Sequence, residues 1–183
     1  MPTINDANGT PAGVNVEGHL ETHSIVEAEA LHVNEDHDSS YSVIFEADPG
    51  GTDIDFFYLK NNDPRDLIIY KIRMSTGTLD VDVDIKLGIT GTPTSGTTVT
   101  PGNMKAGSGG VAKVTCEYRD ADLALTGGTI VDTLYIDKDF VGEQEFDYPG
   151  GIILPENQTM IFNCVGTDPT ADINTVLFFY YHE

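Results

Sequence analysis

Residues 79–90 read Leu-Asp-Val-Asp-Val-Asp-Ile-Lys-Leu-Gly-Ile-Thr, and this stretch decides the fold class. Its apolar side chains recur at every second position: Val81, Val83, Ile85, Leu87 and Ile89. Charged side chains stand between them: Asp80, Asp82, Asp84 and Lys86. A β-strand sends successive side chains to opposite faces, whereas a helix repeats about every 3.6 residues. We therefore expect a strand with the apolar set facing inward and the charged set facing solvent.

Residues 173–183 read Ile-Asn-Thr-Val-Leu-Phe-Phe-Tyr-Tyr-His-Glu and are apolar on both strand faces. We expect one face to fill the core: Val176, Phe178 and Tyr180. The other face must also be covered, either by a second layer of the same chain or by a contact with a subunit or partner: Leu177, Phe179 and Tyr181. We predict that these three form a subunit or partner contact, together with three residues of the N-terminal arm: Val14, Val16 and Leu20.

Further strands are predicted along the whole chain at short, fairly even spacing. They cover residues 41–47, 54–60, 67–75, 111–118, 129–136, 144–148, 151–154 and 159–165. Strong turn signals such as Asn61-Asn62-Asp63-Pro64 separate them. Many short strands in a chain with 19 Gly and 9 Pro are typical of an antiparallel sandwich. We predict an all-β, jelly-roll-like β-sandwich as a single domain at 23–183, preceded by an extended N-terminal arm at 1–22.

At most one short helix is expected, at residues 25–35. Ser24 and Glu27 have the spacing of a capping box, and good helix formers follow them. A strand is the alternative, because Ile25 and Val26 are β-branched. Residues 91–110 are rich in Gly, Thr, Ser and Pro, and we expect a long loop there that projects as a contact.

The formal net charge is −21, from 30 acidic residues against 9 basic ones. Such a field repels phosphate backbones and anionic lipids, so we expect neither nucleic acid nor membrane as a partner. The first residues show no basic segment followed by an apolar one, and we expect no signal peptide. Cys116 and Cys164 are accordingly expected to be buried free thiols rather than a disulfide.

The sequence contains only weak signals for a catalytic or metal-binding site. Zinc needs three or four converging ligands, and four histidines gather near the N-terminus: His19, His23, His32 and His37. Five carboxylates cluster near a predicted loop: Asp137, Asp139, Glu143, Glu145 and Asp147. Both groups are interpreted as solvated side chains, and the serines lie in no nucleophile elbow. We therefore predict no catalytic residue, no cofactor, no metal site and no enzyme activity.

Several segments together resemble small β-sandwich structural proteins from virions of tailed phages. The resemblance rests on residues 14–22, 27–32, 41, 56–63, 66–70, 85–88, 99–103, 107–109, 152–159 and 178–181. It follows the order of the chain and covers most of it. Proteins of this kind look like sandwich pieces that decorate heads or build fibres and tail parts, often as trimers.

The resemblance implies a non-enzymatic capsid decoration or cement protein that stabilises the phage head through oligomeric contacts. Its expected partners are further copies of itself, with a trimer favoured, and the major capsid protein or another virion protein. The expected location is the virion, on the capsid surface, after synthesis in the host cytoplasm. The alternative is a receptor- or carbohydrate-binding β-sandwich module of a phage fibre or tail.

Overall fold

The computed structural model describes residues 29–77, 79–165 and 172–182, which form one helix and eleven strands. The helix is α1 (Glu29–Asp36). The strands are β1 (Ser40–Ala47), β2 (Ile54–Asn61), β3 (Asp66–Thr76), β4 (Val81–Thr90), β5 (Thr97–Thr98), β6 (Gly102–Asn103), β7 (Val114–Tyr118), β8 (Thr126–Ile136), β9 (Gln144–Leu154), β10 (Thr159–Cys164) and β11 (Ile173–His182).

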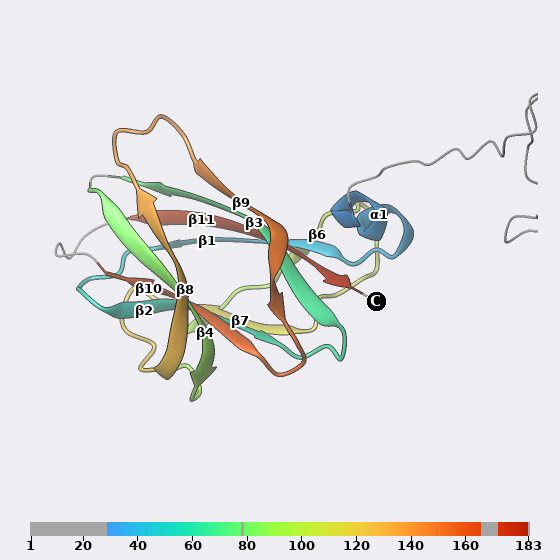
Figure 1. Ribbon diagram of the computed structural model, residues 1–183, viewed down its shortest axis with the longest axis horizontal. Coiled ribbons are helices and arrows are strands. Elements are labelled where there is room, and N and C mark those ends of the chain that lie inside the picture. Colours follow the sequence, from blue (N-terminus) through green and yellow to red (C-terminus); the bar gives the residue numbers. More distant parts are fainter. Residues whose placement is uncertain (1–28, 78, 166–171, 183) are drawn as a thin grey trace, which may run out of the picture.

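The strands form two antiparallel sheets that pack face to face, with α1 at one end (Figure 1). The five-stranded sheet has the order β6-β1-β11-β3-β9, and the six-stranded sheet has the order β5-β7-β2-β10-β4-β8. Apart from the short β5 and β6 and the extra edge strand β7, successive strands cross to the opposite sheet, except that β4 and β8 pair within the six-stranded sheet. This connectivity is that of a jelly roll, and the predicted all-β sandwich is confirmed.

Aromatic and aliphatic side chains from both sheets fill the space between them. Phe45 of one sheet stacks on Phe57 of the other, with ring centroids 4.6 Å apart. Phe57 in turn stacks on Phe162 at 4.9 Å. All three rings are almost fully buried, so they tie the two sheets together through apolar burial and ring stacking.

The two faces of β11 are reversed relative to the sequence prediction. Leu177, Phe179 and Tyr181 are at most 1% exposed and lie in the main core. Phe179 lies opposite Tyr41 of β1, and the two rings stack at 5.4 Å. The prediction that this face forms a subunit or partner contact is therefore wrong for these side chains. The alternative that the same chain supplies the second layer is correct.

The opposite face of β11 lies outside the sandwich and is partly covered by α1. Val33 of α1 forms a small cluster with Tyr180 of β11 and Ile68 of β3. Phe178 lies beside Tyr70, and the Arg73 guanidinium sits over the Phe178 ring at 5.0 Å. Both faces of β11 therefore need apolar residues, which is why the sequence pattern did not distinguish them.

Strand β4 confirms most of the predicted alternation and departs from it at its end. Val81, Val83 and Ile85 face the core as expected. Gly88 has a φ of 73°, and beyond it Ile89 packs on the outer face with Tyr58, Leu123 and Ile161. The inward prediction for Ile89 is thus wrong, because the glycine turns the backbone.

Among the outward residues of β4, Asp84 is buried at 8% exposure, against the prediction. It accepts a hydrogen bond from the Thr133 hydroxyl of β8 over 2.6 Å. A neighbouring strand therefore covers a carboxylate that the sequence pattern assigns to solvent.

Three further predictions are adjusted. Residues 144–148 and 151–154 form one strand, β9, in which Gly151 has a φ of 69°. Residues 91–110 contain β5 and β6, which pair with β7 and β1 and so connect the edges of the two sheets. The arm at 1–22 and the capping pair at 24 and 27 lie outside the described residues, and α1 is seen from Glu29 onward.

Candidate interaction surface

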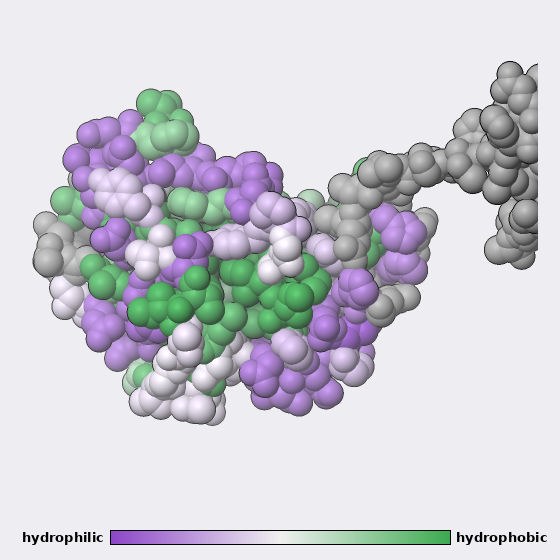
Figure 2. All heavy atoms as spheres, in the orientation of Figure 1, coloured by the Kyte–Doolittle hydropathy of each residue, from purple (hydrophilic) through white to green (hydrophobic). Residues whose placement is uncertain are grey.

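The connection between β8 and β9, residues 137–143, projects from the sandwich and carries two exposed apolar side chains. Phe140 is 52% exposed and Val141 is 97% exposed. The connection is the protrusion at the top of Figure 1, and apolar atoms stand at its tip in Figure 2. We call residues 137–143 the tip loop. Exposed apolar groups on a projecting loop are typical of a contact surface.

Hydrogen bonds hold the base of the tip loop. The Gln144 side chain accepts from the Asp137 amide over 2.6 Å and donates to the Tyr135 carbonyl over 3.3 Å. The Asp137 carboxylate accepts from the Asp139 amide over 2.8 Å, and its carbonyl accepts from the Phe140 amide over 3.2 Å. These bonds use the polar groups near the base, so the apolar pair is left at the outside of the turn.

Ion pairs engage most of the carboxylates that surround the loop. Glu143 lies 3.0 Å from Arg73. Lys71 contacts Glu145 and lies 3.3 Å from Asp147. The hydrogen bond that Lys71 donates to Glu145 raises the pKa of Lys71.

Two cations of β3 therefore pair with three of the five carboxylates in the acidic cluster predicted from the sequence. Within the described ranges, no group of His, Cys, Asp and Glu side chains could hold a metal ion.

More apolar side chains are exposed along the adjoining strands. Ile130 and Val131 of β8 are 54% and 48% exposed, and Ile153 of β9 is 49% exposed. Figure 2 shows apolar atoms gathered over the region where β8 and β9 run in Figure 1. β8 and β9 are edge strands of their sheets, so this side of the sandwich is open to a neighbour.

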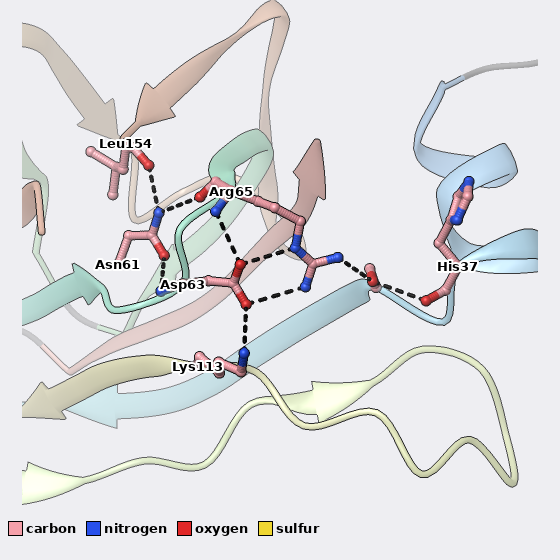
Figure 3. Close-up of polar contacts among 7 residues, drawn as sticks. His37, Asn61, Asp63, Arg65, Lys113 and Leu154 are labelled. Atoms are coloured by element: carbon pink, nitrogen blue, oxygen red, sulfur yellow. Dashed lines mark hydrogen bonds and ion pairs between the residues drawn. The ribbon is translucent and has the colours of Figure 1, made fainter. Parts of the chain in front are cut away.

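A buried polar network holds the turn between β2 and β3 (Figure 3). The Asp63 carboxylate accepts from Arg65 and lies 3.5 Å from the Lys113 ammonium. The Asn61 side chain donates to the carbonyls of Arg65 and Leu154, over 2.8 and 2.9 Å. These contacts join the turn to the end of β9.

The same network reaches the chain near α1 and the end of β11. Arg65 donates to the Ser39 hydroxyl over 3.3 Å, and that hydroxyl donates to the His37 carbonyl over 2.9 Å. The guanidinium also lies over the Tyr181 ring at 4.8 Å. The sequence predicted a turn here but not this junction, which we interpret as structural.

A second polar group lies on the outer face of the six-stranded sheet. The Asn163 amide donates to Asp55 over 2.7 Å, and the Lys86 ammonium lies 4.0 Å from the same carboxylate. Burial raises the pKa of Asp55 despite these two partners. Asn163 and Lys86 therefore give the buried Asp55 carboxylate a hydrogen-bond donor and a positive charge within the sheet.

The remaining predicted groups are placed as follows. The rings of His32 and His37 meet edge to face at 5.3 Å, whereas His19 and His23 lie outside the described residues. Cys116 and Cys164 are buried thiols that are not joined in a disulfide, as expected. Val14, Val16 and Leu20 lie outside the described residues. Sequence reasoning missed Phe140 and Val141, although an apolar pair inside an acidic, Gly-containing turn was a readable signal.

Comparison of the chain with models of known protein families, with curated proteins and with solved structures gives no match. In the described part of the chain, no helix has the length and apolar content needed to cross a membrane.

Proposed function

We propose that this chain is a non-enzymatic structural protein of a tailed-phage virion, most simply a decoration or cement protein on the capsid surface. The resemblance described above motivates the class of protein. The observation that carries the proposal is the tip loop, where Phe140 and Val141 stand exposed on a projection. In this role, the tip loop contacts the major capsid protein or another virion protein, and the protein acts as a homo-oligomer, with a trimer favoured.

Burial of the tip side chains would supply the apolar part of the binding energy. Fully burying a Val or Phe side chain is worth about 1.5–3 kcal/mol. One such contact is weak, but copies joined in a trimer bind together because each raises the effective concentration of the next. A protein that binds only the expanded capsid lattice stabilises that lattice by mass action.

The charge of the chain bears on the choice of partner. With a net charge of −21, the protein associates fastest with a basic surface. We therefore expect capsid binding to weaken as salt concentration rises. Binding that is indifferent to salt would remove the electrostatic part of the proposal and leave the apolar part.

The test is co-sedimentation of the purified protein with expanded capsids of the phage whose virions contain it, and with unexpanded capsids as a reference. The wild type is expected to pellet with expanded capsids, and the double variant Phe140→Ser, Val141→Ser is expected to remain in the supernatant. Val111→Ser is the matched control, because Val111 is 75% exposed and lies outside the tip loop.

The proposed function and the assignment of the contact to the tip loop are contradicted by different results. A chain that is missing from purified virions, or that shows no affinity for either capsid form, contradicts the proposed function. Equal loss of binding in the control variant contradicts the assignment of the contact to the tip loop.

A receptor- or carbohydrate-binding module remains the alternative function. Such modules stack sugars on exposed aromatic rings, and Tyr135 of β8 is 55% exposed. Tyr41, Tyr58, Tyr180 and Tyr181 are buried and offer no such surface. Specific hits on a glycan array that disappear in Tyr135→Ala would favour this alternative over decoration.

A further inference from the structure

Three side chains from neighbouring strands meet at one carboxylate oxygen on the outer face of the six-stranded sheet. Asp55 lies on β2, Asn163 on β10 and Lys86 on β4, and these strands follow one another in the sheet (Figure 1). Nδ2 of Asn163 donates to Oδ1 of Asp55 over 2.7 Å, and Nζ of Lys86 lies 4.0 Å from the same oxygen. An amine, a carboxamide and a carboxyl group are therefore gathered around one atom.

The pairing of the strands places Lys86 within reach of the Asn163 amide. Asn163 lies directly opposite Asp55 of β2. On its other side it lies opposite Asp84, two positions before Lys86 on β4. Lys86 and Asn163 are therefore diagonal neighbours on one face, and diagonal neighbours, about 7–8 Å apart, are within reach of long side chains. The flexible stem of lysine lets Nζ swing from the Asp55 carboxyl group to the amide carbon.

The surroundings of Asp55 favour its protonated form. Asp55 is buried, and burial raises its pKa, as do the nearby carboxylates of Asp122 and Asp53. When the Asp55 carboxylate takes a proton from the Lys86 ammonium, a neutral acid and a neutral amine result. A neutral pair costs less to bury than two charges, and the Lys86 side chain is only 18% exposed. The neutral amine is the nucleophilic form of lysine.

The amide carbonyl of Asn163 is not engaged by another group. Its Oδ1 is buried and has no hydrogen-bond partner among the described residues. A buried carbonyl oxygen without a donor is costly, and most such oxygens in proteins are paired. Once Asp55 is protonated, rotation of the amide about its terminal bond lets this oxygen accept a hydrogen bond from the acid. That hydrogen bond polarises the amide carbon and prepares it for attack.

We propose that Lys86 and Asn163 join in an intramolecular isopeptide bond, with Asp55 as the general acid and base. Nζ of Lys86 attacks Cγ of Asn163 and forms a new C–N bond. The bond from Cγ to Nδ2 then breaks, and the Asp55 carboxyl group delivers a proton to the leaving nitrogen. The proton that Nζ loses on becoming an amide nitrogen restores the acid. Overall, an ammonium group and a carboxamide give an amide and an ammonium ion, so no oxidant or other reactant is needed.

The inference goes beyond the proposed function, because the bond forms within an isolated chain and needs no partner. The reaction occurs once per chain and changes only the chain itself, so it confers no enzyme activity. The bond ties β4 to β10 between residues far apart in the sequence. A cross-link of this kind stabilises a fold by restricting the unfolded chain.

Intact mass spectrometry of the full chain, denatured after incubation in its folded form, tests the proposal. The wild type should be lighter than its sequence requires by one ammonia, and proteolysis should yield a peptide in which Lys86 and Asn163 are joined. Lys86→Met removes the nucleophile and should retain the ammonia. Lys60→Met is the matched control, because Lys60 lies near the opposite end of β2 from Asp55 and should leave the ammonia loss unchanged.

Asp55→Asn should retain the full mass, and Asp55→Ala takes its place if the first variant fails to fold. Stability gives a second readout, since Lys86→Met should unfold at a lower urea concentration than Lys60→Met. A wild type of full sequence mass would overturn the proposal, and so would a loss of ammonia without a peptide that links Lys86 to Asn163. A folded Asp55 variant that forms the link as fast as the wild type would overturn the role of Asp55.

Discussion

The Arg65 guanidinium donates to both carboxylate oxygens of Asp63, over 2.9 Å from Nε to Oδ1 and 3.2 Å from Nη2 to Oδ2. Asp63 is 1% exposed, while Arg65 is partly exposed and lies over the Tyr181 ring. A paired, buried carboxylate of this kind is costly to disrupt from one side, because its partner is left without compensation. The pair therefore couples the β2–β3 turn to the end of β11.

Asp63→Asn should destabilise the protein by about 1–3 kcal/mol, because the guanidinium loses its charged partner. The free energy of unfolding in urea measures the effect. Asp66→Asn is the matched control, since Asp66 lies close by but is exposed. Equal effects of the two substitutions would show that the pair contributes no more than general charge.

The same carboxylate should make stability depend on pH in the acid range. Hydrogen bonding from Arg65 lowers the pKa of Asp63 from 3.8 to about 2 in the folded protein. A depressed folded pKa contributes stability that is fully present above the unfolded pKa and is lost as pH falls through the folded one.

The contribution, on the order of 2 kcal/mol, should therefore be lost between about pH 4 and about pH 2. Urea unfolding of wild type and Asp63→Asn over this range should show their difference shrinking toward acid. A difference that stays constant would mean that the pKa is not depressed.

The reversed faces of β11 predict unequal costs for neighbouring aromatic residues. Phe179→Ala opens a cavity beside Tyr41 in the core and should cost about 3–5 kcal/mol. Phe178→Ala should cost less, because Phe178 lies on the outer face and is only half-buried. Thermal and urea unfolding of both variants measures this. A larger cost at Phe178 would restore the face assignment expected from the sequence.

Gly128 of β8 should not tolerate a side chain. Its φ is 87°, and an added Cβ would clash with the Ile89 side chain and approach the Leu87 carbonyl oxygen at 3.2 Å. Gly128→Ala should therefore cost about 1–3 kcal/mol. Gly109→Ala is the control, because an added Cβ there has open space around it. Equal stability of both variants would contradict this reading.

The two thiols should be inert in the folded protein. Cys116 and Cys164 are 2% and 1% exposed, and burial raises the pKa of Cys116. Since the thiolate is the reactive form, labelling with a thiol reagent at neutral pH should be slow in buffer and rapid in denaturant. Labelling of two thiols per chain in urea would confirm that the two cysteines form no disulfide. Fast labelling of the native chain would contradict their burial.

The sequence alone determined the strands and the class of fold, because alternation of side chains is a local property of an extended backbone. Residues 79–90 were assigned in this way, and the inward apolar residues of β4 follow the predicted pattern as far as Leu87. The β2–β3 turn was also assigned locally, from its Asn, Asp and Pro residues. Even the need to cover both faces of β11 could be read from its composition.

The tertiary structure alone decided which face of β11 is inside, since each face is apolar and burial depends on what packs against it. The six-stranded sheet, which shares the core with Phe179, and α1, which packs on Tyr180, settle that question. The same holds for Ile89, which a single glycine conformation moves to the outer face, and for Asp84, which β8 covers. For β11 and Asp84 the deciding residues are distant in the sequence, and for Ile89 the alternation of side chains does not record the conformation of the neighbouring Gly88.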